Sequence, residues 1–351
     1  MVQCLEAILN KYLIHQILLI QMLMIYALML PYQYYVEEVR FQMKKLKPNK
    51  ASGPDSVPSA LFKVLPAEWI TYITALFNNI FITGSYPTNW ETAKLFCIHK
   101  RGSKTVPNNY RGINVINTIA KVYHMVLSAR LHQWFVPYRK QAGSQVGRGC
   151  VEHLVTLRML MDIARRKKLK LFVTFVDFSK AYDCVPGLNL FMSLKRTGCG
   201  VTMLLTLAAM YECTNSIIGS TIIAATIGVC QGSPTSCILF VLYVNAMIEL
   251  IKQRCLIDDI LSWLYVLVMM DDTVILSTTR EGRINKIQIM HEFCRSHGTI
   301  VNNSKTKFMV VNGSSQDNEP IVCENNVINY CDHYMYLGSP FTNDGSPLTG
   351  I

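Results

Sequence analysis

The sequence lacks the cysteine and histidine spacing of a zinc site. Its twelve cysteines include no C-x-x-C pair, and no Cys/His cluster has the spacing that tetrahedral zinc needs. This excludes a zinc knuckle within the sequence. Cys97, Cys184, Cys230 and Cys237 lie in or beside apolar stretches, where a free thiol usually packs as a small hydrophobic group. We therefore expect reduced core cysteines and an intracellular compartment.

The sequence also lacks a long uninterrupted apolar run. Residues 8–30 are mostly Leu, Ile, Met and Tyr, but polar residues interrupt them, and the longest clean run is 22–30. A membrane-spanning helix needs about 20 predominantly apolar residues. A signal peptide needs a basic start and a small-residue cleavage site, and neither is evident. We favour a helix or a non-native leader for residues 1–30, with a signal peptide or a membrane segment as alternatives that cell fractionation would distinguish.

Acidic residues are fewer than basic ones. The chain has 34 Lys and Arg against 23 Asp and Glu, a net charge of +11, which favours polyanionic partners. The cations form three clusters: Lys44, Lys45, Lys47 and Lys50; Lys100, Arg101 and Lys104; and Arg165, Arg166, Lys167, Lys168 and Lys170. For the third cluster alone, a solvated helix end or a nuclear-import patch is the better explanation. With 50% hydrophobic residues over 351 positions, the chain can form a core and two subdomains.

Three carboxylates stand next to strand-like apolar runs. Asp271 and Asp272 lie between the runs 264–270 and 273–276, which predicts a tight hairpin with both acids at its tip. Asp177 ends another run, 171–176. Hard divalent cations prefer oxygen ligands, and two ions held by carboxylates can promote in-line attack on a phosphate. The pattern predicts a metal site, with a plain turn of solvated acids as the alternative.

A second acidic pair, Asp258-Asp259, is a weaker candidate for such a site. Only Leu256 and Ile257 separate it from the polar stretch 252–254. This pattern is typical of a loop that follows a helix.

Periodicity indicates a mixed order of helices and strands around the acids. Apolar residues at three- and four-residue spacing over 284–297, followed by Gly298, predict a helix. The stretch 307–311 predicts a strand. From Asp177 the order is strand, helix, hairpin, helix, strand, which is a split β-α-β arrangement.

A glycine-flanked turn precedes the first of these helices. Ser233 and Pro234 suit an N-cap and a first turn, so a helix is expected from there to about Lys252. Gly228 and Gly232 flank the turn, where absent side chains would let a nucleic-acid backbone come close.

The segments around these residues resemble, in order, the palm motifs of a reverse transcriptase. They are F-V-D-F-S-K-A-Y-D at 175–183, G-V-C-Q-G-S-P at 228–234, M-M-D-D at 269–272, K-T-K at 305–307 and Y-L-G at 336–338. Three upstream segments resemble the fingers of non-LTR (LINE-type) retrotransposon polymerases: K-A-S-G-P-D-S-V-P at 50–58, I-H-K-R-G at 98–102 and N-Y-R-G-I at 109–113. The resemblance extends from about residue 40 to the end, and it is specific because all the motifs occur in the family's order.

The resemblance implies an α+β fold: right-hand polymerase fingers and palm, a palm with a ferredoxin-like split β-α-β sheet, and a thumb that is largely missing. It divides the chain into a leader of uncertain status (1–30), an N-terminal fingers extension (31–81), a reverse transcriptase domain of fingers and palm (82–344) and a truncated start of the thumb (345–351). On this interpretation the chain is truncated at both ends and lacks the endonuclease that target-primed integration needs.

The resemblance also implies catalytic roles. Asp177, Asp271 and Asp272 would hold two Mg²⁺ ions, for which Mn²⁺ can substitute, with Asp272 contributing less directly. The ions would activate the primer 3′-hydroxyl and stabilise the departing pyrophosphate. Lys100 and Arg111 match the fingers positions that meet the triphosphate, where cations neutralise developing charge.

Four further residues match nucleotide-binding positions. Tyr182 matches an aromatic gate against the ribose 2′-hydroxyl, with ordinary core packing as the alternative. Gln231 and Gly232 would lie near the template base and the incoming nucleotide. Lys305 matches the lysine of the K-T-K motif, with a solvated strand start as the alternative.

The implied function is an RNA-directed DNA polymerase of a non-LTR retrotransposon. Its partners would be an RNA template, a DNA primer and deoxynucleoside triphosphates, in the nucleus or cytoplasm, with no specific protein partner and no membrane. The family usually has an aromatic and a small residue before the Asp pair, whereas this chain has Met269 and Met270. A catalytically inactive retroelement fragment that still binds RNA or RNA–DNA duplex, or a membrane-associated protein, are the alternatives.

Overall fold

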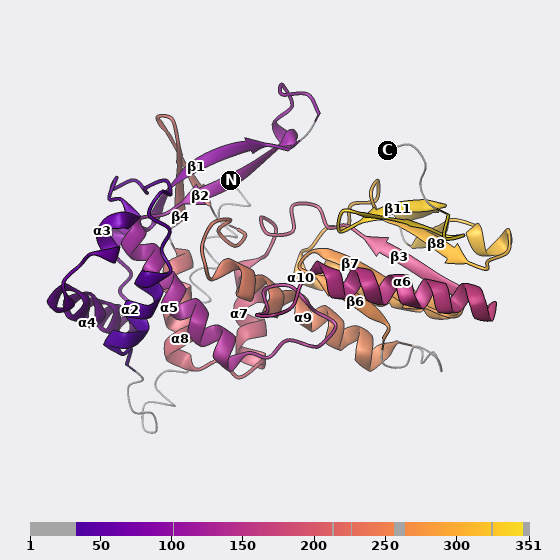
Figure 1. Ribbon diagram of the computed structural model, residues 1–351, viewed down its shortest axis with the longest axis horizontal. Helices are drawn as coiled ribbons and strands as arrows, with labels where there is room; N and C mark the ends of the chain where they lie inside the picture. The colour runs from indigo at the N-terminus through magenta and orange to yellow at the C-terminus, as the bar shows by residue number, and fades with distance from the viewer. Residues whose placement is uncertain are drawn as a thin grey trace. The chain divides into compact units, whose positions relative to one another are not determined.

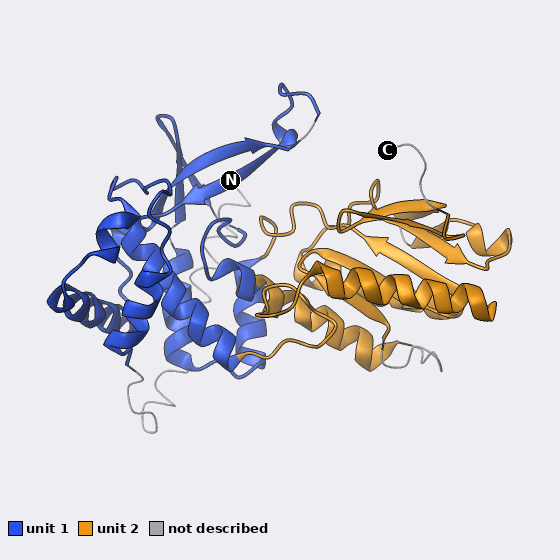
Figure 2. Cartoon of the chain, viewed as in Figure 1, with its two compact units in different colours: residues 1–134, 186–239 blue, residues 135–185, 240–351 orange. Residues whose placement is uncertain are grey.

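The chain folds into two compact units, each built from two separate stretches of sequence (Figure 2). The computed structural model describes residues 33–100, 102–212, 214–225, 227–255, 264–323 and 326–346. Unit 1 takes its residues from 1–134 and 186–239, and unit 2 from 135–185 and 240–351. The predicted leader 1–30 and the pair Asp258-Asp259 lie outside the described residues. The linear division at residues 31–81 and 82–344 stays a prediction.

Unit 1 combines helices with a four-stranded sheet (Figure 1). Its helices are α2 (Val36–Lys44), α3 (Ser59–Lys63), α4 (Ala67–Thr83), α5 (Thr118–Trp134), α7 (Gly187–Arg196) and α8 (Val201–Glu212), with short 3₁₀ turns η1 (Thr88–Trp90) and η2 (Pro107–Asn109). Its strands β1 (Thr92–His99), β2 (Tyr110–Val115), β4 (Thr214–Ile218) and β5 (Thr221–Ala225) form a sheet in the order β2-β1-β4-β5. Buried aromatic rings, Phe77 and Tyr123 among them at 5.0 Å, fill the space between α4 and α5.

Unit 2 is built on a six-stranded sheet. Its helices are α6 (Cys150–Lys167), most of α9 (Ser236–Arg254) and α10 (Arg280–His297), with the 3₁₀ turn η3 (Gln316–Asn318). Its strands are β3 (Leu171–Val176), β6 (Val266–Met269), β7 (Asp272–Ser277), β8 (Lys307–Val311), β9 (Ile321–Cys323) and β10 (Asn326–Tyr330), and a separate hairpin pairs β11 (His333–Tyr336) with β12 (Ser339–Thr342). The sheet order is β6-β7-β3-β8-β10-β9. Its first four strands are antiparallel and have the ferredoxin-like order, which confirms the predicted split β-α-β arrangement.

Strand β3 is buried on both faces, which is why its sequence is apolar at nearly every position. On one face, Val173 and Phe175 pack with Met161 of α6, which lies along the sheet (Figure 1). On the other face, the guanidinium of Arg283 from α10 lies over the rings of Phe172 and Phe308, at 4.7 and 4.2 Å from their centroids. Both layers therefore hold the strand that leads directly into Asp177.

The predicted helix and strand after the acids are confirmed. Helix α10 begins at an N-cap, Thr279, whose hydroxyl oxygen accepts the Gly282 amide at 3.0 Å. It ends at Gly298, which takes the left-handed conformation that favours glycine there. Strand β8 has the predicted bounds. Helix α9 begins at Ser236 rather than Ser233, because Pro234 and Thr235 form a turn, although the Ser233 hydroxyl accepts the Thr235 amide at 3.4 Å.

One prediction about burial needs correction. Cys97 and Cys237 are exposed and Cys184 and Cys230 are partly buried, so none of these four is a core cysteine. Position along an apolar stretch did not reveal which side of the strand or helix faces solvent. Among the described helices, only α9 is long and apolar enough to cross a membrane, and most of that apolar window is buried within the protein, so it is weak evidence for a span.

Replacing a buried valine of the unit 2 core tests the importance of this packing. Val311 is fully buried, whereas Val322 is 70% exposed in the same sheet. We expect Val311→Ala to lower the free energy of unfolding by roughly 2 kcal/mol, because it deletes two packed methyl groups. Val322→Ala should change it by less than about 0.5 kcal/mol. Denaturant unfolding measures both, and equal effects would contradict this assignment of the core.

Candidate active site

Strand pairing brings the three predicted acids to one end of the unit 2 sheet. Val176 pairs with Thr273, so the next positions, Asp177 and Asp272, face each other across β3 and β7. Met269 pairs with Asp272, which leaves Met270 and Asp271 as the two-residue turn. The turn prediction is therefore shifted by one residue: Asp272 begins a strand, and Met270 takes the left-handed conformation with φ of 60°.

The electrostatics of the site follow from the proximity of these carboxylates. Burial and, to a smaller extent, the charges of Asp271 and Asp177 together raise the pKa of Asp272 to about 6. Lys305 opposes this shift, and its ammonium nitrogen lies 3.3 Å from an Asp177 carboxylate oxygen. The three acids thus repel one another and attract positive charge.

The donor set fits a hard divalent cation, because it consists of carboxylate oxygens that gain from a positive charge between them. As the side chains stand, the described part of the chain contains no group of three His, Cys, Asp or Glu residues at metal-binding spacing. In the described part of the chain, the Asp177 carboxylate forms an ion pair with the ammonium of Lys305.

Two residues beside the acids, Thr306 and Tyr334, help to hold them in place. The sequence did not single out either residue. The hydroxyl oxygen of Thr306 accepts the Asp177 amide at 3.2 Å. The hydroxyl of Tyr334 donates to the Lys305 carbonyl at 3.1 Å, and its ring stacks on Phe175 with centroids 4.2 Å apart. Burial raises the pKa of Tyr334 to about 12, with contributions from the Asp177 and Asp272 charges. Thr306 is the middle residue of K-T-K, and Tyr334 stands two positions before Y-L-G. Their position within or next to a motif is the sequence signal that could have identified them.

Tyr182 lies in the turn region that follows Asp177. Its ring stacks on that of Phe240 from α9, with centroids 4.5 Å apart and planes 13° apart. The residue as a whole is only partly buried. The packing alternative therefore describes part of this residue's environment, and a role as an aromatic gate stays a prediction.

The predicted fingers cations lie in unit 1, on the ribbon of β1 and β2. Arg111 pairs with Ile98, and the Lys100 amide donates to the Asn109 carbonyl at 2.8 Å, so the pairing extends to Lys100. Because side chains alternate along a strand, Lys100 and Arg111 lie on the same face of this ribbon. Both are exposed, as cations that meet a phosphate would be.

The glycine turn of unit 1 is held by a neighbouring strand. The Asn114 amide donates to the Gln231 carbonyl at 2.7 Å, and the Asn114 side chain accepts from the Ser216 hydroxyl at 2.9 Å. Gly232 has φ of 122°, and a Cβ there would overlap the Asn114 carbonyl oxygen. Close approach of β2 is thus sufficient to require glycine at 232, and the approach of a nucleic-acid backbone to this turn stays a prediction.

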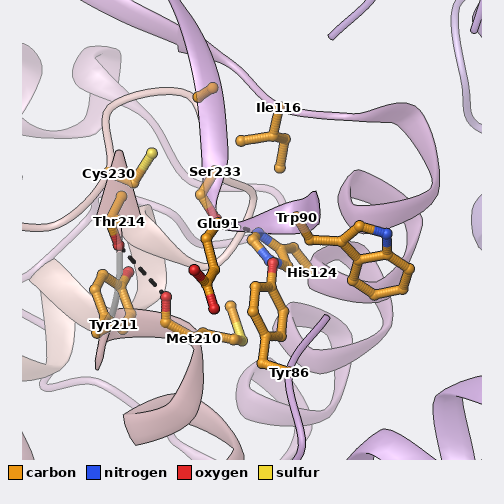
Figure 3. Close-up of a pocket in the computed structure, with 11 residues that line it drawn as sticks. Tyr86, Trp90, Glu91, Ile116, His124, Met210, Tyr211, Thr214, Cys230 and Ser233 are labelled. Atoms are coloured by element: carbon orange, nitrogen blue, oxygen red, sulfur yellow. Dashed lines mark hydrogen bonds between the residues drawn. The ribbon is translucent and has the colours of Figure 1, made fainter. Parts of the chain in front are cut away.

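Beneath this turn, unit 1 contains a small cavity (Figure 3). Buried His124 lies between two hydroxyl groups, with Nδ1 2.8 Å from the Ser233 hydroxyl and Nε2 2.8 Å from the Tyr86 hydroxyl. Burial lowers the pKa of His124 to about 3, so the ring is neutral at physiological pH. Because the pKa of His124 lies well below physiological pH, the ring is a poor proton acceptor. Its two hydrogen bonds make it a structural link between α5 and the turn.

The sheet with acids at one end defines a polymerase palm. Residues 98–341 match the family model described as reverse transcriptase (RNA-dependent DNA polymerase), and the chain belongs to this family.

Several relatives are proteins of mobile elements. The chain is 29% identical over 157 residues to "Probable RNA-directed DNA polymerase from transposon BS" of Drosophila melanogaster, which covers 43% of this chain and 17% of that protein. It is 23% identical over 316 residues to the R2 "Retrovirus-related Pol polyprotein from type-1 retrotransposable element" of Nasonia vitripennis, covering 84% of this chain and 30% of that protein. The chain thus spans less than a third of the length of either. A solved telomerase from Candida albicans is similar with a TM-score of 0.49 at 14% identity, covering 82% of this chain and 49% of that one.

Gly232 provides a test of the glycine turn. Gly232→Ala should lower the free energy of unfolding by about 3 kcal/mol, because it adds backbone strain and overlap with Asn114. Gly200→Ala is the matched control, since a Cβ at Gly200 meets nothing within 4 Å, and it should stay within about 0.5 kcal/mol of the natural chain. Denaturant unfolding compares them. A tolerated Gly232→Ala would mean that the turn and Asn114 are not in contact.

Acid should destabilise the chain through His124. The unfolded chain takes up a proton on this ring as the pH falls through about 6.5, whereas the folded chain does so only near 3. The free energy of unfolding should therefore fall between these pH values, by up to roughly 1.4 kcal/mol per pH unit from this group. His124→Gln should reduce the slope, and the exposed His333→Gln should not. Equal slopes in denaturant unfolding at several pH values would rule out a buried neutral His124.

Proposed function

We propose that this chain is the polymerase core of a non-LTR retrotransposon reverse transcriptase, which adds deoxynucleotides to a primer 3′-hydroxyl under the direction of an RNA template. The observation that carries this proposal is the convergence of Asp177, Asp271 and Asp272 at one end of a buried sheet, in a chain of the reverse transcriptase family.

The carboxylates would hold two Mg²⁺ ions, with Asp177 and Asp271 as main ligands and Asp272 contributing less directly. Bound there, such ions lower the pKa of the attacking hydroxyl and stabilise the negative charge on the phosphate and leaving pyrophosphate. The protein's own part is to keep three like charges close together despite the rise in the pKa of Asp272. Thr306 and the paired strands supply that rigidity.

The remaining predicted residues complete the proposal. Lys100 and Arg111, exposed on one face of their ribbon, would meet the triphosphate of the incoming nucleotide. Gln231 and Gly232 would lie near the template base, and Tyr182 would exclude a ribose 2′-hydroxyl. The net charge of +11 supports an RNA template and a DNA primer as partners. We place the protein in the nucleus or cytoplasm.

Primer extension tests this function. On an RNA template with Mg²⁺ or Mn²⁺, the natural chain should extend a DNA primer, and Asp271→Ala/Asp272→Ala should reduce the rate by about 1,000-fold or more, because the metal-binding charge is lost. The charge-matched control is Asp332→Ala/Asp344→Ala, which removes two exposed acids of the same unit and should extend normally.

Failure of extension in every variant would contradict the proposal. If such a folded chain still bound RNA–DNA duplex, the alternative of a catalytically inactive fragment would take its place. Thermal unfolding of each variant shows that lost activity does not come from lost structure.

A further inference from the structure

The segment 135–149, which precedes α6, closes the edge of the sheet that carries the acids. It runs parallel to β6, with Gln141 bridged to Val268. The Val268 amide donates to the Lys140 carbonyl at 2.8 Å, and the Ala142 amide donates to the Val268 carbonyl at 2.9 Å. This places the segment against the strand that leads directly into the Met270–Asp271 turn.

Gln141 reaches from this segment to the turn itself. Its side chain is fully buried, and its Oε1 accepts the Met270 amide at 3.2 Å and the Gly143 amide at 2.8 Å. Both neighbours are N–H donors, so the atom that faces them must be the amide oxygen. The other side-chain atom, Nε2, is buried without a hydrogen-bond partner among the described residues. Gln141 therefore acts through its acceptor oxygen.

The turn that Gln141 contacts is conformationally demanding. Met270 is a non-glycine residue with φ of 60°, at the first position of a two-residue hairpin turn where glycine is favoured. Such a conformation persists only where surrounding contacts hold it. The contacts here are the Gln141 oxygen on the backbone and the space beside Gly143, where a Cβ would overlap the sulfur of Met270.

We propose that Gln141 is a positioning residue that holds the Met270–Asp271 turn and thereby fixes Asp271 beside Asp177 and Asp272, and that Gly143 makes room for Met270. The inference rests on the proposed polymerase function for its catalytic consequence. It also explains how this chain accommodates methionine where the family usually has a small residue. A loss of this hydrogen bond lets Asp271 drift, and a displacement of about 1 Å can cost about 100-fold in rate.

Gln141→Leu removes the acceptor while keeping a side chain of similar size in place. In primer extension, kcat should fall about 10- to 100-fold while KM for the deoxynucleotide changes less than about 3-fold, because orientation of the acids is lost and nucleotide binding is not. Gln253→Leu is the matched control, since Gln253 is exposed on α9 of the same unit, and it should leave both constants unchanged.

A second substitution separates positioning from simple packing. Met270→Gly lets the turn adopt positive φ without help, so Gln141→Leu/Met270→Gly should recover at least about 5-fold of the kcat lost by Gln141→Leu. Gly143→Ala should also lower kcat and be partly restored by Met270→Gly, which removes the overlapping sulfur. Absence of restoration in both pairs would overturn the proposal in favour of general packing.

Hydrogen exchange provides a readout that does not depend on activity. The peptide that contains Met270 should exchange its amides faster in Gln141→Leu than in the natural chain or in Gln253→Leu. If the natural chain fails to extend primers, the proposed function is contradicted. Hydrogen exchange then still tests whether Gln141 holds the Met270–Asp271 turn. Unchanged amide exchange in Gln141→Leu would overturn the proposed role of Gln141, whatever the result of primer extension.

Discussion

The pairing of β3 with β7 is the constraint on which the candidate site depends. Three carboxylates that repel one another are held together because the strands beneath them are packed on both faces and cannot easily separate. The free energy that opposes the repulsion comes from apolar contacts such as those of Phe175 and Met161, which themselves do no chemistry. The burial of β3 and the placement of the acids are thus coupled, because the strand ends at Val176, directly before Asp177.

In unit 1, too, some residues hold the structure around residues that are predicted to bind the nucleotide, but here the supporting contacts are hydrogen bonds. Asn114 joins β2, β4 and the glycine turn through hydrogen bonds, and His124 fixes the turn from beneath. Arg111 lies on the same strand as Asn114, three residues before it, so the strand that presents a cation also anchors the Gln231–Gly232 turn. Polar links thus add to the apolar packing of this region.

Motifs and periodicity in the sequence predicted those features that depend on local sequence pattern. The bounds of β3 and β8, the glycine end of α10, the ferredoxin-like order of four strands and the convergence of the acids were all accessible, because each depends on local pattern or on the family's motif order. The turn was shifted by one residue because strand register depends on the pairing partner, which is distant in sequence. The roles of Gln141 and Tyr334 were missed for the same reason, since Gln141 lies 129 positions from the turn that it contacts. The exposure of Cys97 depends on which face of a sheet is covered, and no local pattern records that.

The path of the chain between the units has a practical consequence. The backbone passes from one unit to the other at residues 134–135, 185–186 and 239–240, so neither unit is a continuous piece of sequence. A protease cut or a deletion that aims to isolate one unit must sever the other, and β3 in particular would be separated from β7 and β8. Dissection of this molecule therefore requires rearranged chains, with β3 spliced directly before α9, rather than shortened ones.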